Sequence, residues 1–227
     1  MKVKKFVFLL LVCGIFALSA VLYRDKPFSI FFVFVICSMS IWRVWETFLL
    51  SSPSQSHSRD LNFSLLVVGY FIVVYGSIAE FFILDRAWLH VLTPIGAALL
   101  VSSAALRFWS IRTLGPQWTT DISSDTAIRM APMGLKRKGP YHYVRHPVYL
   151  GAIIEILAVP MMGQAIYAFL FALCVNTPLY LRRARIEEQA LLEAFQEDFR
   201  SYSNEVDAFI PFRNNPNKSA RYVGGGI

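Results

Sequence analysis

Charged residues are scarce in this sequence. Lys, Arg, Asp and Glu together make up 16% of the 227 residues, whereas hydrophobic residues make up 56%. A typical soluble domain has about 25% charged residues, and the positive mean hydropathy of +0.48 also departs from that class. The composition excludes an ordinary soluble domain and predicts an integral membrane protein.

Cysteine is scarce too, since the chain holds only Cys13, Cys37 and Cys174. All three lie inside apolar stretches, and none belongs to a CxxC pair or has a histidine at the spacing of a metal ligand. Structural zinc sites require such spacing. We therefore expect no metal site and interpret the three cysteines as small core residues.

The chain also lacks the pattern of a nucleic-acid-binding protein, although its formal net charge is +7. Such proteins gather Lys and Arg on one surface of a soluble domain, whereas here the basic residues flank the apolar runs. We expect the lipid bilayer, and no nucleic acid, as a partner of this chain.

Long apolar runs are what the sequence has in abundance. About 20 apolar residues in a helix cross the hydrocarbon core of a bilayer, and four runs are of that order: 6–23, 28–50, 61–84 and 88–106. The polar breaks between them are short, so neighbouring helices should be antiparallel. The first run can also be interpreted as a cleaved signal peptide, because it combines a basic MKVKK start with ALSA near its end.

A further apolar stretch, 148–181, is too long for one span, and Pro160 and Gly163 interrupt it near the middle. Both residues break helices, so we expect a helical hairpin here. Residues 182–202 then carry apolar side chains at a helical period. The predicted fold class is all-α: a polytopic transmembrane helical bundle with four spans, a C-terminal membrane hairpin and a cytoplasmic amphipathic helix.

Lys and Arg set the predicted orientation, because basic loops stay on the cytoplasmic side. An N-terminus inside the cell places the basic segments 107–145 and 182–221 in the cytoplasm. The first of these is a polar insertion between spans, and long loops in compact proteins are usually functional. Arg43 lies within the second apolar run, where a lone charge is costly, so it should reach the interface or pair with Glu46.

Two polar motifs border the predicted hairpin. Residues 139–151 read GPYHYVRHPVYLG directly before it, and residues 182–188 read RRARIEE directly after it. Taken singly, each has a structural explanation: Arg145 and His146 can be interfacial anchors, and RRARIEE can be the self-paired start of a solvated helix. Their combination around one hairpin argues for a functional site instead.

This combination resembles the signature of the isoprenylcysteine carboxyl methyltransferase family and of the wider phospholipid methyltransferase superfamily: an RHPxYxG element and a Glu-Glu pair separated by a membrane hairpin. The resemblance covers about residues 106–211, from LRFWSIRTLG to the FQEDFRSYSNEVDAFIP ending. It implies an S-adenosylmethionine-dependent methyltransferase in which Arg183 faces and binds the methyl acceptor. The cofactor-binding positions that it implies are Leu135, Tyr141, His146, Pro147, Val148, Tyr149 and Glu187.

The chemistry of these residues agrees with the implied cofactor. Pro147 suits the first turn of a helix, where its missing N–H is not needed. The free backbone donors at such a helix start, next to His146, suit the carboxylate of the methionine moiety. Its ammonium and sulfonium need acidic or aromatic neighbours, which Glu187 and the ring face of Tyr149 provide.

The expected reaction is an in-line displacement on the methyl carbon, accelerated by orientation and by a dry site. A carboxylate acceptor would need only the bidentate grip of Arg183. A phenol or amine acceptor would need deprotonation, and Glu188 and Tyr141 are the candidates for that step. Arg183 and Glu188 are therefore the candidate catalytic residues.

The chain departs from the family pattern in two places. Residues 133–136 read MGLK where many relatives carry His-x-Leu-Val, so a polar contact from that histidine is lost. Gln196 stands where glycine is common. The remaining histidines, His57, His90 and His142, have no signature role, and we expect structural or incidental ones.

Two other function classes compete with a methyltransferase. Membrane sterol reductases share an RHPNY-like motif and use a nicotinamide cofactor, but here Val148 replaces the typical Asn, and Ala152 follows Gly151 where Glu is typical. A non-catalytic membrane scaffold is the second competitor. The intact signature argues against it, because lost activity should leave substitutions at His146, Tyr149 or Glu187.

The sequence does not choose the acceptor, because prenylcysteine carboxylates, phospholipid amines, polyketide phenols and small thiols all suit the superfamily. A lipid-like or small hydrophobic molecule that enters laterally is expected. We divide the chain into N-terminal helices (1–106), a methyltransferase core (107–213) and a flexible tail (214–227). The membrane would be the plasma membrane of a bacterium or the endoplasmic reticulum of a eukaryote.

Overall fold

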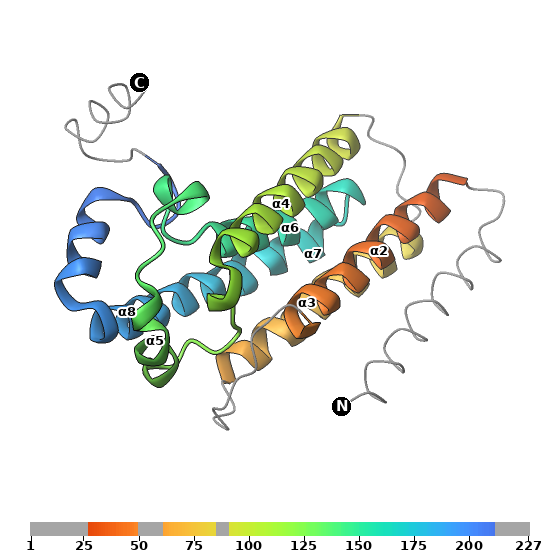
Figure 1. The fold of residues 1–227 in the computed structure, drawn as a ribbon. Helices are drawn as coiled ribbons and strands as arrows, with labels where there is room; N and C mark the ends of the chain where they lie inside the picture. The colour runs from red at the N-terminus through yellow and green to blue at the C-terminus, as the bar shows by residue number, and fades with distance from the viewer. Residues whose placement is uncertain (1–26, 50–60, 85–90, 212–227) are drawn as a thin grey trace, which may run out of the picture.

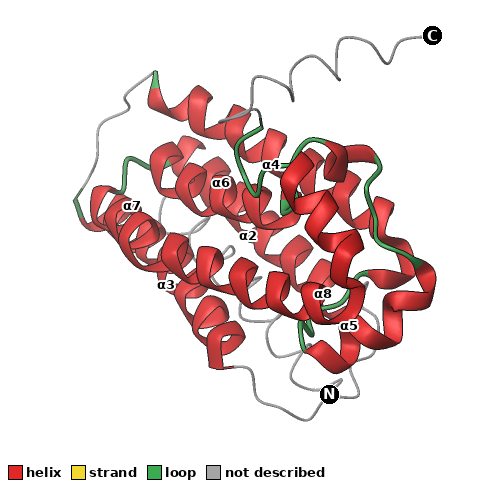
Figure 2. Cartoon of the chain, turned by 90° about the vertical axis from the view of Figure 1, so that its left-hand side faces the viewer, coloured by secondary structure: helices red, strands yellow, loops and turns green. Residues whose placement is uncertain are grey.

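The computed structural model of the protein describes residues 27–49, 61–84 and 91–211. The described residues are helical apart from short connections (Figures 1 and 2). In chain order the elements are α2 (Pro27–Leu49), α3 (Leu61–Ile83), α4 (Leu92–Leu114), η1 (Gly115–Gln117), α5 (Ser124–Met130), η2 (Ala131–Met133), η3 (Gly139–His142), α6 (Pro147–Met162), α7 (Ile166–Phe171), η4 (Ala172–Asn176) and α8 (Thr177–Glu205). The predicted first span or signal peptide, the predicted tail, His57 and His90 lie outside the described residues.

The all-α prediction is confirmed for the described part of the chain. Extended backbone pairs there only in one isolated parallel bridge, between Val144 and Asp207. Helices α2, α3, α4, α6 and α7 form a bundle, and α5 and the second half of α8 gather at one end of it (Figure 1). By length and composition, Leu61–Ile83 and Leu92–Gln117 could each cross a bilayer.

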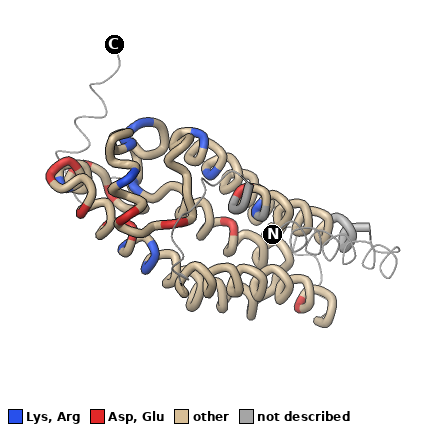
Figure 3. Tube along the Cα trace, turned by 60° about the horizontal axis from the view of Figure 1, so that its bottom comes forward, with Lys and Arg blue, Asp and Glu red and all other residues tan. Residues whose placement is uncertain are grey.

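The outside of the bundle is apolar along much of its length. Val68 on α3 is 55% exposed and Val101 on α4 is 67% exposed. Charged residues instead gather at the end that carries α5 and the second half of α8 (Figure 3). An apolar belt beside a charged end is the arrangement expected of a helical bundle in a membrane, with its polar end in water.

Helix α4 differs from the sequence prediction. The predicted span ended at residue 106 and a polar loop was expected from Arg107, but the helix continues to Leu114. Arg107 and Ser110 are buried within this extension, 4% and 0% exposed. The prediction of a loop was wrong because it treated Arg107 as a solvated charge, whereas a carboxylate of α2 neutralises it inside the bundle.

Small residues bring α4 and α6 into close contact. A Cβ atom added to Gly96 would lie 2.8 Å from the backbone nitrogen of Met162, and one added to Gly151 would lie 2.5 Å from Cγ of Arg107. Two hydroxyls also bridge the helices, because Thr93 donates to the carbonyl of Met162 and Ser103 to that of Gly151. Close approach at small residues is how membrane helices pack, and here it fixes the start of α6.

The long apolar stretch turns between α6 and α7. Helix α6 ends at Met162, and α7 begins at Ile166. The carboxylate of Glu80 on α3 accepts hydrogen bonds from the backbone N–H groups of Tyr167 and Ala168, 3.0 and 3.2 Å away. Glu80 therefore satisfies backbone donors that a helix start leaves without helical partners.

The two described cysteines have different environments. Cys37 is buried, as expected, but Cys174 is exposed on the bundle surface. The prediction of a core position for Cys174 was wrong, because an apolar surface in contact with lipid accepts the same side chains as a core. Cys13 lies outside the described residues.

Helix α8 carries the predicted amphipathic segment and bends within it. Ala190, Phe199 and Tyr202 are buried on its apolar face. At Gln196 the backbone takes φ 45° and ψ −115°, and the helix direction changes there. A positive φ favours glycine, and this chain adopts it at Gln196 despite the side chain.

Candidate active site

A cavity opens at the polar end of the bundle, between α5, η3, the start of α6 and α8. We call it the first cavity. Its volume is about 930 Å³ including its open mouth. Every residue expected from the family resemblance at the cofactor lines it: Leu135, Tyr141, His146, Pro147, Val148, Tyr149 and Glu187.

The two polar motifs meet at this cavity. Glu187 Oε2 lies 3.9 Å from His146 Nδ1, and Glu188 Oε1 lies 2.9 Å from His146 Nε2. A carboxylate can only accept hydrogen bonds, so Nε2 of His146 donates to Glu188. The adjacent glutamates point in different directions, as expected of neighbours on a helix: Glu187 lines the cavity, while Glu188 binds His146 and Arg145.

Backbone contacts fix the position of His146. Pro147 opens α6, and His146 precedes it with non-helical φ −120° and ψ 57°. The N–H of His146 donates to the carbonyl of Ala208 at 3.0 Å, and that of Arg145 donates to the carbonyl of Asp207 at 2.9 Å. The segment after α8 therefore holds the RHP motif from outside the bundle.

Ionisation of Glu188 stabilises this arrangement. Its half-buried position raises the pKa of the carboxyl, but the hydrogen bond from His146 and the charge of Arg145 together lower the pKa below its usual 4.5. Because its pKa is lowered, Glu188 remains a carboxylate well below neutral pH. Its two partners, Arg145 and His146, belong to the signature motif.

Replacing Glu188 by glutamine should remove a pH-dependent part of the stability. Because the folded-state pKa is lowered, the ionised carboxylate stabilises the protein fully above pH 4.5 and loses this effect as the pH falls through the lowered value. We expect thermal unfolding in detergent to show a shallower pH dependence below 4.5 for E188Q than for the wild type. Exposed Glu193 provides the control, and E193Q should keep the wild-type slope. Equal slopes in E188Q and wild type would contradict the assignment.

Tyr141 is held as a neutral phenol. Burial, and next the negative charge of Glu187, raise the pKa of Tyr141 well above its usual value of 10. Its carbonyl accepts a hydrogen bond of 2.6 Å from the hydroxyl of Tyr202. Tyr141 can donate a hydrogen bond into the first cavity, but its raised pKa makes it a poor general base for the acceptor.

A second cavity of about 820 Å³, including its open mouth, lies beside the first. It reaches between α2, α3 and α8, and Arg183 lines it. Arg183 donates to the carbonyl of Thr120, and its guanidinium carbon lies 5.1 Å from the centre of the Phe63 ring. The expected acceptor residue Arg183 thus lines the second cavity and not the first.

Tyr149 stands between the two cavities. The residues that line both of them are Trp118, Thr119, Val148 and Tyr149. Tyr149 is close enough to Glu187 and Arg183 to be affected by the negative charge of the first and the positive charge of the second.

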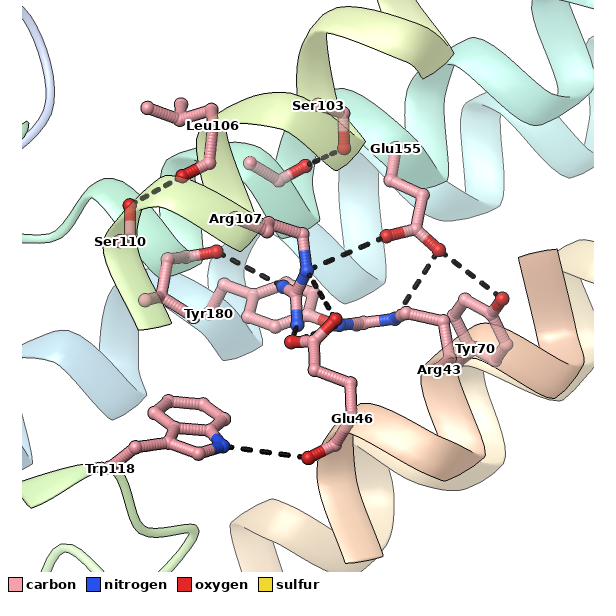
Figure 4. Close-up of polar contacts among 12 residues, drawn as sticks. Arg43, Glu46, Tyr70, Ser103, Leu106, Arg107, Ser110, Trp118, Glu155 and Tyr180 are labelled. Carbon is pink, nitrogen blue, oxygen red and sulfur yellow. Dashed lines mark hydrogen bonds and ion pairs between the residues drawn. The ribbon is translucent and has the colours of Figure 1, made fainter. Parts of the chain in front are cut away.

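A buried cluster of charges lies behind the second cavity (Figure 4). Arg43 binds Glu155 at 3.3 Å and approaches Glu46 at 3.7 Å. Arg107 makes a bidentate pair with Glu46, lies 3.9 Å from Glu155 and donates to the carbonyl of Val148. Two arginines and two glutamates therefore neutralise one another in the apolar bundle, and the prediction that Arg43 pairs with Glu46 is confirmed.

Sequence reasoning missed most of this cluster. Arg107 was placed in a cytoplasmic loop, which the structure corrects, and no role was given to Glu155 or Tyr70. One signal was present: Glu46 and Glu155 are carboxylates inside apolar runs, and such residues in membrane helices pair with each other or with arginines. His142, for which no role was expected, is exposed on η3.

Comparison with known proteins finds similarity to one family of membrane methyltransferases. A sequence profile of the isoprenylcysteine carboxyl methyltransferase (ICMT) family matches residues 95–193. The protein-S-isoprenylcysteine O-methyltransferase of Saccharomyces cerevisiae is 21% identical over 83% of this chain and 81% of its own. The structure of the eukaryotic intramembrane Ras methyltransferase ICMT superposes with a TM-score of 0.61 at 18% identity, over 93% of this chain and 86% of that one. Over residues 95–193 the chain is similar to the ICMT family, and its fold is similar to that of the solved ICMT.

Two bacterial relatives broaden the comparison. The uncharacterised protein YpbQ of Bacillus subtilis is 28% identical over 59% of this chain and 76% of its own length. Methanethiol S-methyltransferase 1 of Bradyrhizobium diazoefficiens is 36% identical, but the match covers only 32% of this chain and 25% of that enzyme. The matched profile and the named methyltransferases support a membrane methyltransferase over the reductase and scaffold alternatives.

Proposed function

We propose that the protein transfers a methyl group from S-adenosylmethionine, bound in the first cavity, to an acceptor bound in the second cavity. The observation that carries this proposal is the common wall: Val148 and Tyr149 line both cavities, with Glu187 on one side and Arg183 on the other. Direct transfer requires the two reactants to meet at one place in a fixed orientation.

The lining of the first cavity fits S-adenosylmethionine. This cofactor supplies a methyl group activated by a positively charged sulfur. Glu187 offers a carboxylate to the cationic end, and the rings of His146 and Tyr149 stack 5.6 Å apart beside it. The first turn of α6 offers backbone N–H groups to a carboxylate, and Leu135 contributes to an apolar wall.

The other site residues bind and orient. Arg183 holds the polar head of the acceptor, and Tyr149 stands in the wall between the cavity of Glu187 and that of Arg183. We assign Glu188 a positioning role in place of the catalytic role expected from sequence, because its interactions hold Arg145 and His146. Val148 and the ring of Trp118 keep the common wall apolar, which excludes water from the reacting atoms.

The acceptor in this proposal is lipid-like or small and hydrophobic. Apolar side chains of α3, including Phe63, Leu66 and Val67, line the second cavity. The named relatives act on protein S-isoprenylcysteine or on methanethiol. Enzymes similar to this chain therefore include one with a large lipid-modified acceptor and one with a very small acceptor. The reaction would take place at the charged, cytoplasmic end of the bundle, within the predicted core 107–213.

Replacing Arg183 by methionine should lower kcat/KM for the acceptor about ten- to a hundredfold, because a hydrogen bond to a charged group is lost. The affinity for S-adenosylmethionine should stay within about twofold. The measurement uses purified protein in detergent, methyl-labelled S-adenosylmethionine and a lipid and metabolite extract, followed by isolation of the labelled product. Arg182 is exposed one position earlier, so R182M is the matched control.

Two results would overturn the proposed function. One is a wild-type protein that binds no S-adenosylmethionine. The other is an R183M variant that methylates the same acceptor at the wild-type rate.

A further inference from the structure

The hydroxyl groups of two tyrosines in the second cavity have different hydrogen-bond partners. Tyr70 of α3 and Tyr180 of α8 both line this cavity and both contact the buried charge cluster. The hydroxyl of Tyr70 donates its hydrogen to Glu155 Oε1 at 3.3 Å. The hydroxyl of Tyr180 instead accepts a hydrogen from Arg43 Nη2, also at 3.3 Å (Figure 4). A phenol has one hydrogen to donate, so Tyr70 has already used its hydrogen whereas Tyr180 has not.

Tyr180 also lies close to the common wall of the two cavities. Its ring centre is 6.3 Å from that of Tyr149. Of Tyr70 and Tyr180, Tyr180 is therefore the one whose hydrogen is available to a molecule in the second cavity.

Arg43 strengthens Tyr180 as a donor. Its guanidinium binds Glu155 through Nε and donates to the Tyr180 oxygen through Nη2. Withdrawal of electron density from a phenol oxygen by a cation makes its hydrogen a better donor, because linked hydrogen bonds polarise one another. Arg43 and Arg107 line the second cavity, whereas their partners Glu46 and Glu155 are not among its lining residues. The positive ends of both ion pairs thus face the acceptor space.

We propose that Tyr180 is an acceptor-binding residue: its hydroxyl donates a hydrogen bond to the attacking atom or head of the acceptor, and Arg43 polarises it. An anionic oxygen or sulfur nucleophile satisfies this donor and the arginine-lined wall. A protonated amine does not, because it brings further donors and a positive charge. This inference rests on the proposed function and narrows its acceptor to an anion on an apolar body.

The chain provides a matched pair of variants, Y180F and Y70F. Each removes one phenol oxygen from the same cavity and breaks one contact with the charge cluster. The measurement is methyl transfer from labelled S-adenosylmethionine to three probes of equal chain length, octanethiol, octanoate and octylamine, by the full chain in detergent. We expect transfer to the thiol or the carboxylate and none to the amine. Y180F should lower kcat/KM for the accepted probe about ten- to a hundredfold, and Y70F, which removes a hydroxyl already bonded to Glu155, should lower it at least about threefold less than Y180F does.

A double-variant comparison tests the role of Arg43. If Arg43 acts through Tyr180, R43Q should lower acceptor kcat/KM in the wild-type background but add little in the Y180F background, since coupled residues are not additive. Full additivity would mean that Arg43 does not act through Tyr180. The Y180F and Y70F pair decides the main point even if R43Q fails to fold.

The outcomes separate this inference from the proposed function. Failure to bind S-adenosylmethionine defeats both. Normal cofactor binding with efficient methylation of octylamine, or with no methylation of octanethiol and octanoate, overturns the acceptor class. Turnover that Y180F and Y70F reduce equally, or that Y180F leaves unchanged, overturns the assignment of Tyr180 and leaves the methyltransferase proposal standing.

Discussion

Replacing Glu187 by glutamine should weaken S-adenosylmethionine binding about ten- to a hundredfold, the range expected for loss of a partly buried contact to a charge. The amide keeps the size of the side chain but cannot neutralise the cationic end of the cofactor. S-adenosylhomocysteine lacks the sulfonium charge, so its affinity should fall less. Calorimetric titration of both ligands into the purified protein measures the difference.

Exposed Glu193, on the same helix, is the control for that measurement. E193Q should bind both ligands as the wild type does. A normal affinity of E187Q for S-adenosylmethionine would remove Glu187 from the cofactor site. Equal weakening of both ligands would place Glu187 near the amino-acid end and away from the sulfur.

Replacing Arg107 by methionine should lower the free energy of unfolding by about 3–5 kcal/mol, as measured when one partner of a buried ion pair is removed. Arg107 is 4% exposed and binds Glu46, which is 1% exposed. The variant leaves the charge of Glu46 uncompensated in an apolar bundle. The other arginine near Glu46 is Arg43, whose Nη1 lies 3.7 Å from Glu46 Oε1, but Arg43 already binds Glu155. Denaturant titration of the detergent-solubilised protein measures the loss.

The double variant E46L/R107M distinguishes loss of pairing from loss of packing. Removing both charges together should recover much of the stability, because apolar replacements of a buried pair are often neutral or stabilising. Arg43 and Glu155 remain paired in this variant. A double variant as unstable as R107M would show that the arginine acts through its hydrogen bond to the carbonyl of Val148 or through packing.

The sequence was sufficient to predict which residues surround the first cavity. The RHP motif and the Glu-Glu pair are each local, so their geometry follows from helix periodicity and from the position of Pro147 at a helix start. Their meeting across the turn between α6 and α7 was an expectation from the family resemblance, and the structure brings His146 Nδ1 within 3.9 Å of Glu187. The roles assigned to the two residues stay predictions.

The second cavity was much harder to predict. Its walls combine Arg43, Tyr70 and Tyr180 from three helices that are distant in the sequence. Which helices become neighbours depends on packing at small residues such as Gly151, and a single sequence does not specify such contacts. Arg107 was mispredicted for the same reason. Its local composition predicted a polar loop, but its ion pair with Glu46 on α2 allows the helix to continue inside the bundle.

The backbone pairing of Asp207 and Ala208 with the RHP motif sets an order of assembly during synthesis. Helices α2 to α6 can enter the bilayer while the ribosome is still translating, but Arg145 and His146 receive these carbonyl partners only after residue 208 has emerged. The methyl donor would therefore meet a complete binding surface only after this pairing has formed.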